Sequence, residues 1–298
     1  DTVDKLNTYA KAVGKDVKIV GIPKTIDNDL CITDHTPGYG SAAKYVASTL
    51  LEIGHDTSIY PINSVTIVEI MGRDAGWLTG ASVLARNKYN HAPHLIYLPE
   101  VAFDEAQFIE DVREAIKKYN NVVIAVSEGI RLADGRYICE LGSSGDYVDA
   151  FGHKQLAGTA TYLANFLAAE CGCKTRAVEL STLQRSASHM ASRVDIDEAF
   201  MVGGAAVKAA DEGDTGKMVV IDRVSDDPYM AATGIYDVHR IANEEKLVPR
   251  EWMNKDATNV TKDFVDYIKP LIQGDYQPIM VNGMPRHLVL NLKKGRKR

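Results

Sequence analysis

The stretch Pro23-Lys24-Thr25-Ile26-Asp27-Asn28-Asp29 decides how this chain is interpreted, because it directly follows a run of apolar residues. That run, Val17-Lys18-Ile19-Val20-Gly21-Ile22, predicts a buried strand. Open α/β sheets bind ligands at the carboxyl ends of their strands, so we expect two carboxylates and an ammonium group at such a site. One acid to accept a proton, a second to hold Mg²⁺ and a lysine to stabilise a phosphate are most of what phosphoryl transfer requires.

Helix and strand patterns alternate along the rest of the chain. Helices are predicted over 3–13, 40–53, 76–87, 104–119, 158–169 and 195–211, and strands over 17–22, 65–71, 95–98, 121–126 and 218–221. Gly54 is expected to end the helix before it, and the cluster Gly38-Tyr39-Gly40-Ser41 is expected to cap the same helix at its start. This alternation favours an α/β fold with parallel sheets covered on both faces.

Length and composition narrow the class of protein. A chain of 298 residues with 45% hydrophobic and 25% charged residues is typical of a globular protein and long enough for two lobes. A net charge of −6 argues against a nucleic-acid partner or an anionic membrane surface. No apolar run approaches the roughly 20 residues of a membrane span. The expected location is the cytoplasm, with no membrane partner.

Short motifs in a fixed order resemble those of one enzyme family. The opening stretch matches the PKTIDND signature of the phosphofructokinases, Met71-Gly72-Arg73 matches their MGR motif, and Ser127-Glu128 matches their (S/T)E motif. Thr175-Arg176-Ala177 precedes Leu183-Gln184-Arg185, where the family has TRA and then QR, and the segment 281–288 is similar to the family's C-terminus. The resemblance therefore covers the whole chain.

The resemblance implies an architecture and an expected gap. It implies two Rossmann-like parallel-sheet lobes, with residues 1–37 as the remainder of the donor-binding lobe, 38–185 as the sugar-phosphate-binding lobe, and 186–298 as the return to the donor lobe and the C-terminal segment. Family members begin with a glycine-rich turn and a GGD(G/D)S motif that bind the phosphoryl donor, and neither occurs here. We therefore expect a truncated chain that recognises sugar phosphate without turning it over.

The implied activity is that of a 6-phosphofructokinase of glycolysis. It transfers a phosphoryl group from diphosphate or ATP to the 1-hydroxyl of fructose 6-phosphate, giving fructose 1,6-bisphosphate. Asp27 is the implied general base, Asp29 the implied Mg²⁺ ligand, and Arg73 the implied contact to the migrating phosphoryl group or to a sugar phosphate. The Thr25-Ile26-Asp27 portion binds the substrate in the family, although the Thr25 hydroxyl could instead cap the backbone.

The remaining motifs imply further substrate contacts. Met71 and Gly72 contribute backbone and shape, and Glu128 accepts hydrogen bonds from sugar hydroxyls. The residues implied for the 6-phosphate and its surroundings are Arg176, Thr182, Gln184 and Arg185. In the family the counterpart of Arg176 reaches a neighbouring subunit, so we expect a homodimer or homotetramer.

Lys24 bears on the identity of the donor. Bacterial ATP users typically have glycine at this position, whereas lysine is characteristic of diphosphate users and of some atypical ATP users. The resemblance therefore favours diphosphate, with ATP as the alternative. Three departures from the family pattern are Thr182 for His or Tyr, Ser186 for Gly, and Ser64 where many ATP users have an arginine.

Two other classes of function remain open from the sequence. A regulatory or scaffold homologue would keep the fold and the sugar-phosphate site but lose turnover. The intact Asp27, Asp29 and Arg73 argue against it, whereas the missing donor motif keeps it open. A diacylglycerol or NAD kinase has a related fold but lacks the MGR and QR motifs, so it is the weaker alternative.

Overall fold

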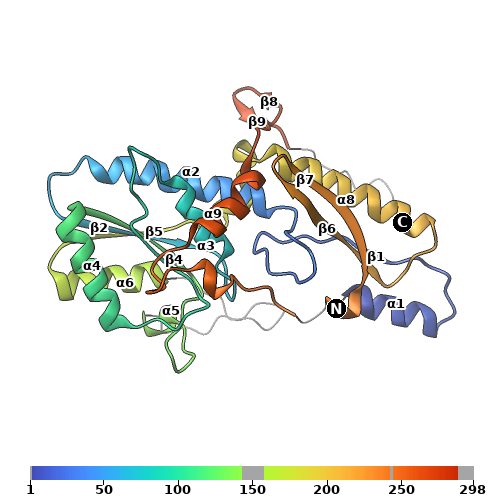
Figure 1. The fold of residues 1–298 in the computed structure, drawn as a ribbon, viewed down its shortest axis with the longest axis horizontal. Coiled ribbons are helices and arrows are strands. Elements are labelled where there is room, and N and C mark those ends of the chain that lie inside the picture. The colour runs from blue at the N-terminus through green and yellow to red at the C-terminus, as the bar shows by residue number, and fades with distance from the viewer. Residues whose placement is uncertain (1, 143–157, 242–243, 288–298) are drawn as a thin grey trace, which may run out of the picture.

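A computed structural model of the chain describes residues 2–142, 158–241 and 244–287 (Figure 1). Leu288, at the end of the C-terminal motif, lies outside these ranges. The helices are α1 Thr2–Ala12, α2 Tyr39–Ser58, α3 Trp77–Ala81, α4 Glu105–Tyr119, α5 Ile138–Gly142, α6 Thr159–Cys171, α7 Leu183–Ser186, α8 Arg193–Asp211 and α9 Lys262–Ile268. The strands are β1 Val20–Gly21, β2 Ser64–Ile70, β3 Leu95–Tyr97, β4 Asn121–Ser127, β5 Lys174–Glu179, β6 Lys217–Asp226, β7 Tyr229–Asp237, β8 Met280–Val281 and β9 Met284–Pro285. Short 3₁₀ turns are η1 Ser82–Ala85, η2 Ser188–Met190, η3 Val238–Arg240, η4 Arg250–Trp252 and η5 Lys269–Ile272.

The larger sheet is parallel throughout, with strand order β3-β4-β2-β5. Every residue of β2 and β4 is buried, because helices cover both faces of the sheet. On one face Val68 and Ile70 of β2 pack in a core that includes α2, α3 and α9. On the other face Val65 and Ile67 pack in a core that includes α4 and α6. Because side chains alternate between the two faces of the sheet, this one buried strand contributes residues to two separate cores.

The smaller sheet has the order β1-β6-β7 and is mixed. β1 pairs with β6 in parallel, whereas β7 turns back antiparallel to β6. Val202 and Ala206 of α8 pack against Val219 and Ile221 of β6. Figure 1 shows the two sheets in separate parts of the molecule, with the segment after β1 running between them. The signature therefore lies where the two parts meet.

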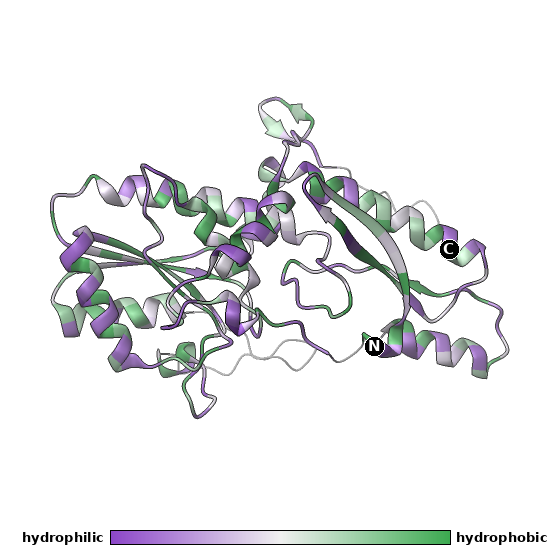
Figure 2. Ribbon diagram, in the orientation of Figure 1, coloured by the Kyte–Doolittle hydropathy of each residue, from purple (hydrophilic) through white to green (hydrophobic). Residues whose placement is uncertain are grey.

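Several expectations from the sequence are confirmed. The class is α/β with a parallel sheet, and the helix predicted over 104–119 is α4, whose first N–H groups bond to the Asp104 carboxylate. Figure 2 shows hydrophilic and hydrophobic residues alternating along α4, as its amphipathic pattern predicts. Gly38 precedes α2 at a φ of 106°, in the capping position expected for it. Among the described residues, none of the helices is both long and apolar enough to span a membrane.

Two local predictions are wrong. The strand predicted over 17–22 pairs only at Val20 and Gly21, opposite Lys217 and Met218. About half of the surface of Val17 and of Ile22 is exposed. Gly54 does not end α2, which continues to Ser58. Gly54 instead allows α2 to approach Asn90, whose side-chain oxygen would lie 2.6 Å from a Cβ at this position.

Candidate functional site

Thr25 orients Asp27 at the start of the signature turn. Its hydroxyl oxygen accepts the Asp27 N–H at 3.0 Å and lies 3.2 Å from the Asp27 Oδ2, to which the hydroxyl donates. The Thr25 carbonyl accepts a hydrogen bond from the Thr36 hydroxyl at 2.7 Å, which fastens the turn to the segment before α2. The structure thus shows the backbone-capping role of the Thr25 hydroxyl, and its contact with substrate stays a prediction.

Asp27 lies among three cations that come from three different segments. Burial raises the pKa of its carboxyl group above the ordinary value. The Thr25 hydrogen bond and the positive charges of Lys24, Arg185 and Arg73 act in the opposite direction. A partly desolvated carboxylate is a stronger base than one in water, and the nearby cations favour its ionised form. The arrangement suits proton abstraction beside a bound anion.

Asp29 is the second acid of the turn. Its pKa is raised by burial and, after that, by the negative charge of Asp27. Two carboxylates that repel each other in this way suit a divalent cation, which would offset the repulsion. In the described ranges no cluster of three or more His, Cys, Asp or Glu residues could hold a metal ion. Mg²⁺ needs only one or two protein carboxylates because it keeps several waters, so the pair fits this ion.

The loops that follow β2 and β4 interlock. The Ser127 hydroxyl donates to the Gly72 carbonyl at 2.5 Å, and Gly72 has a φ of 137°, which favours glycine. A Cβ on Gly129 would lie 1.7 Å from the Arg73 carbonyl oxygen, so the two loops touch backbone to backbone. The carboxyl ends of these neighbouring strands therefore present Arg73 and Glu128 together.

Glu128 faces the same site as Asp27. Its Oε1 accepts the Gly72 N–H at 3.4 Å, and its carbonyl accepts the Thr159 hydroxyl at 3.2 Å. Burial raises the pKa of Glu128 to about 7, and the negative charges of Glu69 and Asp27 add to the rise, while Arg73 opposes it. A buried acid that is half ionised near neutral pH can accept or donate hydrogen bonds to sugar hydroxyls.

The predicted phosphate-binding residues separate into two groups. Arg185 lies in α7, is exposed, and is close enough to lower the pKa of Asp27. Its neighbour Thr182 is exposed, whereas Gln184 is only 2% exposed and its amide nitrogen and oxygen make no hydrogen bond within the described residues. Gln184 is therefore buried beside the site, although the sequence predicted it as a substrate contact, and that role stays a prediction.

Arg176 lies apart from this cluster. It lies near the middle of β5, the edge strand of the larger sheet, in register with Thr66, and pairs with Asp56 of α2 at 3.1 Å. Its guanidinium also lies over the Tyr60 ring, with 6.0 Å between them. The structure of the single chain thus brings Lys24, Asp27, Arg73, Glu128 and Arg185 together and leaves Arg176 elsewhere.

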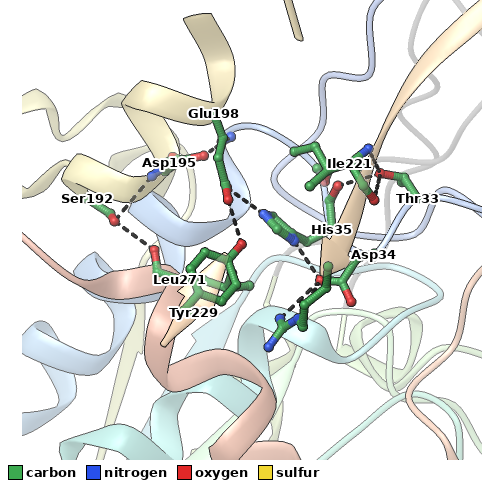
Figure 3. A network of polar contacts seen from close by, with 12 residues as sticks. Thr33, Asp34, His35, Ser192, Asp195, Glu198, Ile221, Tyr229 and Leu271 are labelled. Atoms are coloured by element: carbon green, nitrogen blue, oxygen red, sulfur yellow. Dashed lines mark hydrogen bonds and ion pairs between the residues drawn. The ribbon is translucent and has the colours of Figure 1, made fainter. Parts of the chain in front are cut away.

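A buried polar network fastens the segment after the signature (Figure 3). His35 is 1% exposed and lies between Asp34, at 2.7 Å, and Glu198 of α8, at 2.6 Å. Burial alone would lower the His35 pKa, but the two carboxylates outweigh it and raise the pKa. Arg223 of β6 donates to Asp34, and the Tyr229 hydroxyl of β7 donates to Glu198. The segment between the sheets is therefore tied to the smaller sheet and its helix.

The sequence did not single out three residues at this site. Glu69, next to the last residue of β2, accepts the Ala160 N–H at 2.8 Å, and a lone acid inside an apolar run was a usable signal. Lys246 and Tyr267 hydrogen-bond to Asn28 of the signature. They follow it by more than two hundred positions, so no local pattern connects them to it.

Comparisons with known proteins agree with this geometry. A family model described as Phosphofructokinase matches residues 1–210. A pyrophosphate–fructose 6-phosphate 1-phosphotransferase of Halomonas elongata is 40% identical over 96% of this chain and 68% of its own length. One of Xanthomonas campestris is 41% identical over 97% of this chain and 69% of its own length. The crystal structure of a pyrophosphate-dependent phosphofructokinase from Nitrosospira multiformis has a TM-score of 0.86 and 32% identity, covering 97% of this chain and 68% of that one.

Proposed function

The chain belongs to the phosphofructokinase family, and from this premise we propose that it transfers a phosphoryl group from diphosphate to the 1-hydroxyl of fructose 6-phosphate. The product is fructose 1,6-bisphosphate, a step of glycolysis. The observation that carries the proposal is the placement of Asp27, partly buried at the mouth of β1, among Lys24, Arg73 and Arg185. The names of its relatives favour diphosphate over ATP as the donor. We propose a cytoplasmic location for this reaction.

Asp27 is the general base of the proposed reaction. The 1-hydroxyl oxygen of the sugar attacks the nearer phosphorus of diphosphate, and its proton passes to the Asp27 carboxylate. The new bond joins that oxygen to phosphorus, the bridging P–O bond breaks, and orthophosphate leaves. Arg73 binds the migrating phosphoryl group in a bidentate manner, because a planar guanidinium can donate to two oxygens at once. Lys24 stabilises the charge of the donor.

The other residues bind the substrate. Glu128 accepts hydrogen bonds from sugar hydroxyls, with Met71 and Gly72 shaping the loop beside it, and Thr25 with Ile26 lines the turn. The 6-phosphate is bound by Arg185, with Thr182 and Gln184 beside it. We assign Arg176 to the 6-phosphate of a neighbouring subunit, because it lies away from the cluster of its own chain. This assignment requires a homodimer or a homotetramer.

Mg²⁺ is the proposed cofactor. Asp29 would hold it, directly or through water, with Asp27 close by. When bound, the ion neutralises charge on the phosphate oxygens of the donor. The carboxylates of Asp27 and Asp29 provide the negative charge for this ion. The repulsion between them, which contributes to the raised pKa of Asp29, is consistent with a cation site.

One assay with a matched variant tests the proposal. The full-length protein, given fructose 6-phosphate, Mg²⁺ and diphosphate, is expected to form fructose 1,6-bisphosphate and orthophosphate, both visible by phosphorus NMR. Asp27→Ser should reduce turnover by about 10²- to 10⁴-fold, the usual cost of losing a general base. Sugar binding measured by calorimetry should be retained.

The control is Asp16→Ser, which removes an exposed acid that pairs only with Lys18 in the described structure. It should leave both turnover and binding unchanged. Turnover with ATP but not with diphosphate would reassign the donor. Sugar binding without product from either donor would replace the proposal with a non-catalytic sugar-phosphate-binding homologue.

A further inference from the structure

The middle residue of the signature turn faces the interior, between its two acids. Asn28 is fully buried and has a φ of 57°, in the left-handed region that asparagine tolerates better than most residues. Its side-chain N–H donates to the Tyr267 hydroxyl oxygen at 2.9 Å, and its side-chain oxygen accepts from the Lys246 ammonium at 3.2 Å. Both the nitrogen and the oxygen of the Asn28 side-chain amide are therefore hydrogen-bonded, to Tyr267 and to Lys246.

Lys246 is hydrogen-bonded to the signature turn and the segment after it at three further points. Its ammonium group donates to the carbonyl of Asp34 at 2.6 Å and to that of Thr33 at 3.3 Å. Together with the bond to Asn28, these use all three hydrogens of the ammonium group. Its backbone N–H donates to the Asp29 carbonyl at 2.7 Å. One residue thus spans the segment from 28 to 34.

Tyr267 closes the same network from α9. It is partly buried, and its hydroxyl donates to the Asp34 carbonyl at 2.7 Å while accepting from Asn28. Its ring packs at 5.3 Å from both Trp77 and Trp252. The Trp77 indole N–H donates to the Lys246 carbonyl at 2.7 Å. An aromatic cluster therefore fixes both residues that contact Asn28.

We infer that Lys246 and Tyr267 are positioning residues, which hold the carboxylates of Asp27 and Asp29 in their working orientation through Asn28. Neither side chain is assigned a contact with substrate. The inference rests on the proposed function, since it assigns Asp27 and Asp29 the roles of base and metal ligand. A misplacement of about 1 Å can cost a reaction roughly 10²-fold in rate, so a rigid support behind the turn has a direct effect on turnover.

The main variant is Lys246→Met, which keeps the length of the side chain and removes the ammonium group. We expect kcat to fall by about 10²-fold, with the KM for fructose 6-phosphate changed less than about threefold. Binding of Mn²⁺, followed by electron paramagnetic resonance in the absence of substrate, should weaken as well. Lys44→Met is the matched control, because Lys44 donates to Gly274 and Asp275, away from the signature. It should leave kcat, KM and Mn²⁺ affinity unchanged.

A double-variant cycle separates positioning from general stability. Asn28→Gly keeps the backbone conformation but removes the amide. If Lys246 acts through Asn28, the double variant should lose much less kcat than the product of the two single losses. Tyr267→Phe removes only a hydroxyl, and it serves in place of Lys246→Met should the latter fail to fold.

Three results would overturn the inference. The first is a Lys246→Met protein whose unfolding midpoint falls while its kcat and Mn²⁺ affinity match those of Lys44→Met. The second is a fully multiplicative loss of kcat in the double-variant cycle. The third is a Tyr267→Phe protein with unchanged kcat and Mn²⁺ affinity. A wild-type protein that binds Mn²⁺ without turnover overturns the proposed function alone, and the Mn²⁺ titration then decides on Lys246. A wild type that does neither overturns both.

Discussion

Gly129 and Arg73 illustrate how closely single residues control this site. No side-chain carbon fits on Gly129, because it would lie 1.7 Å from the Arg73 carbonyl. We expect Gly129→Ala to lower the free energy of unfolding by about 2 kcal/mol or more, as overpacked positions do, and to reduce turnover by displacing Arg73. Chemical denaturation and the phosphotransfer assay measure the two effects.

The control for this prediction is Gly204→Ala on the outer side of α8. Nothing lies within 4 Å of a Cβ there. Because alanine is favoured over glycine inside a helix, this variant should gain about 0.5 to 1 kcal/mol of stability with turnover unchanged. A Gly129→Ala protein as stable and active as Gly204→Ala would show that the two loops are not in contact.

Lys24 is the residue expected to distinguish donors. It is exposed at the mouth of the site and close to Asp27. Lys24→Ala should lower kcat/KM for diphosphate by about 10- to 100-fold, the equivalent of one charged hydrogen bond. Lys18→Ala, on the exposed segment before β1, should change nothing. An equal loss with ATP as the donor would contradict a role specific to diphosphate.

At the scale of elements, Glu69 links β2 of the larger sheet to α6. Its carboxylate accepts the Ala160 N–H and is also stabilised by the N–H groups of Gly158 and Thr159, at the start of the helix. The helix in turn bonds to the Glu128 carbonyl through Thr159. Glu69 thus supports a helix end that contacts the site, without facing the substrate itself.

This carboxylate predicts a particular pH dependence of stability. Burial raises the pKa of Glu69 from 4.5 to about 7. Between these values the folded protein holds a proton that the unfolded chain has released, so stability is lost as the pH rises through this window. Glu69→Gln removes the titration and keeps an acceptor for Ala160. Relative to wild type, it should gain stability from about pH 5 to pH 8, approaching about 3 kcal/mol.

Urea denaturation across this pH range measures the difference. Glu114→Gln is the control, because Glu114 is exposed on α4 and pairs with Lys117. Its stability difference from wild type should not vary with pH by the same amount. A Glu69→Gln difference that stays flat would mean that Glu69 does not titrate in this window.

The helices and strands that could be predicted are those whose own sequence contains a clear pattern. α4 has an amphipathic repeat and a capping aspartate, and it lies where expected. β5 was missed because Lys174–Glu179 mixes charged and apolar residues at the edge of the sheet, where only β2 pairs with it. β7 was missed because small residues occupy its middle, 231–234, and its partner, β6, decides its conformation.

The site divides in the same way. Arg73, Glu128 and Arg185 were predicted from motifs that follow strands of the parallel sheet, which brings those strand ends together. Asp27 was predicted from the motif that follows β1 of the smaller sheet. The contribution of Lys246 and Tyr267 could not be predicted, because their contact with Asn28 exists only after the chain returns from the smaller sheet.

At the scale of the whole molecule, the position of Arg176 argues for a site shared between subunits. The division of the chain into donor and sugar-phosphate lobes at 38 and 185 remains a prediction. The predicted phosphate contact of Arg176 cannot be made within its own chain without leaving Asp56 and crossing from the middle of β5 to the strand ends. A closed symmetric assembly can instead present Arg176 to the site of the next subunit.

Mixed oligomers test this arrangement. Asp27→Ser and Arg176→Ala are each expected to be nearly inactive at low fructose 6-phosphate. After the two are unfolded and refolded together, a hybrid dimer should contain one site with both native residues, because each subunit supplies what the other lacks. Random pairing then restores about a quarter of the wild-type sites. Mixing Asp27→Ser with Glu128→Ala should restore none, since both residues act in the site of one chain. Equal recovery in both mixtures, or none in either with dimers confirmed by light scattering, would place Arg176 outside the shared site.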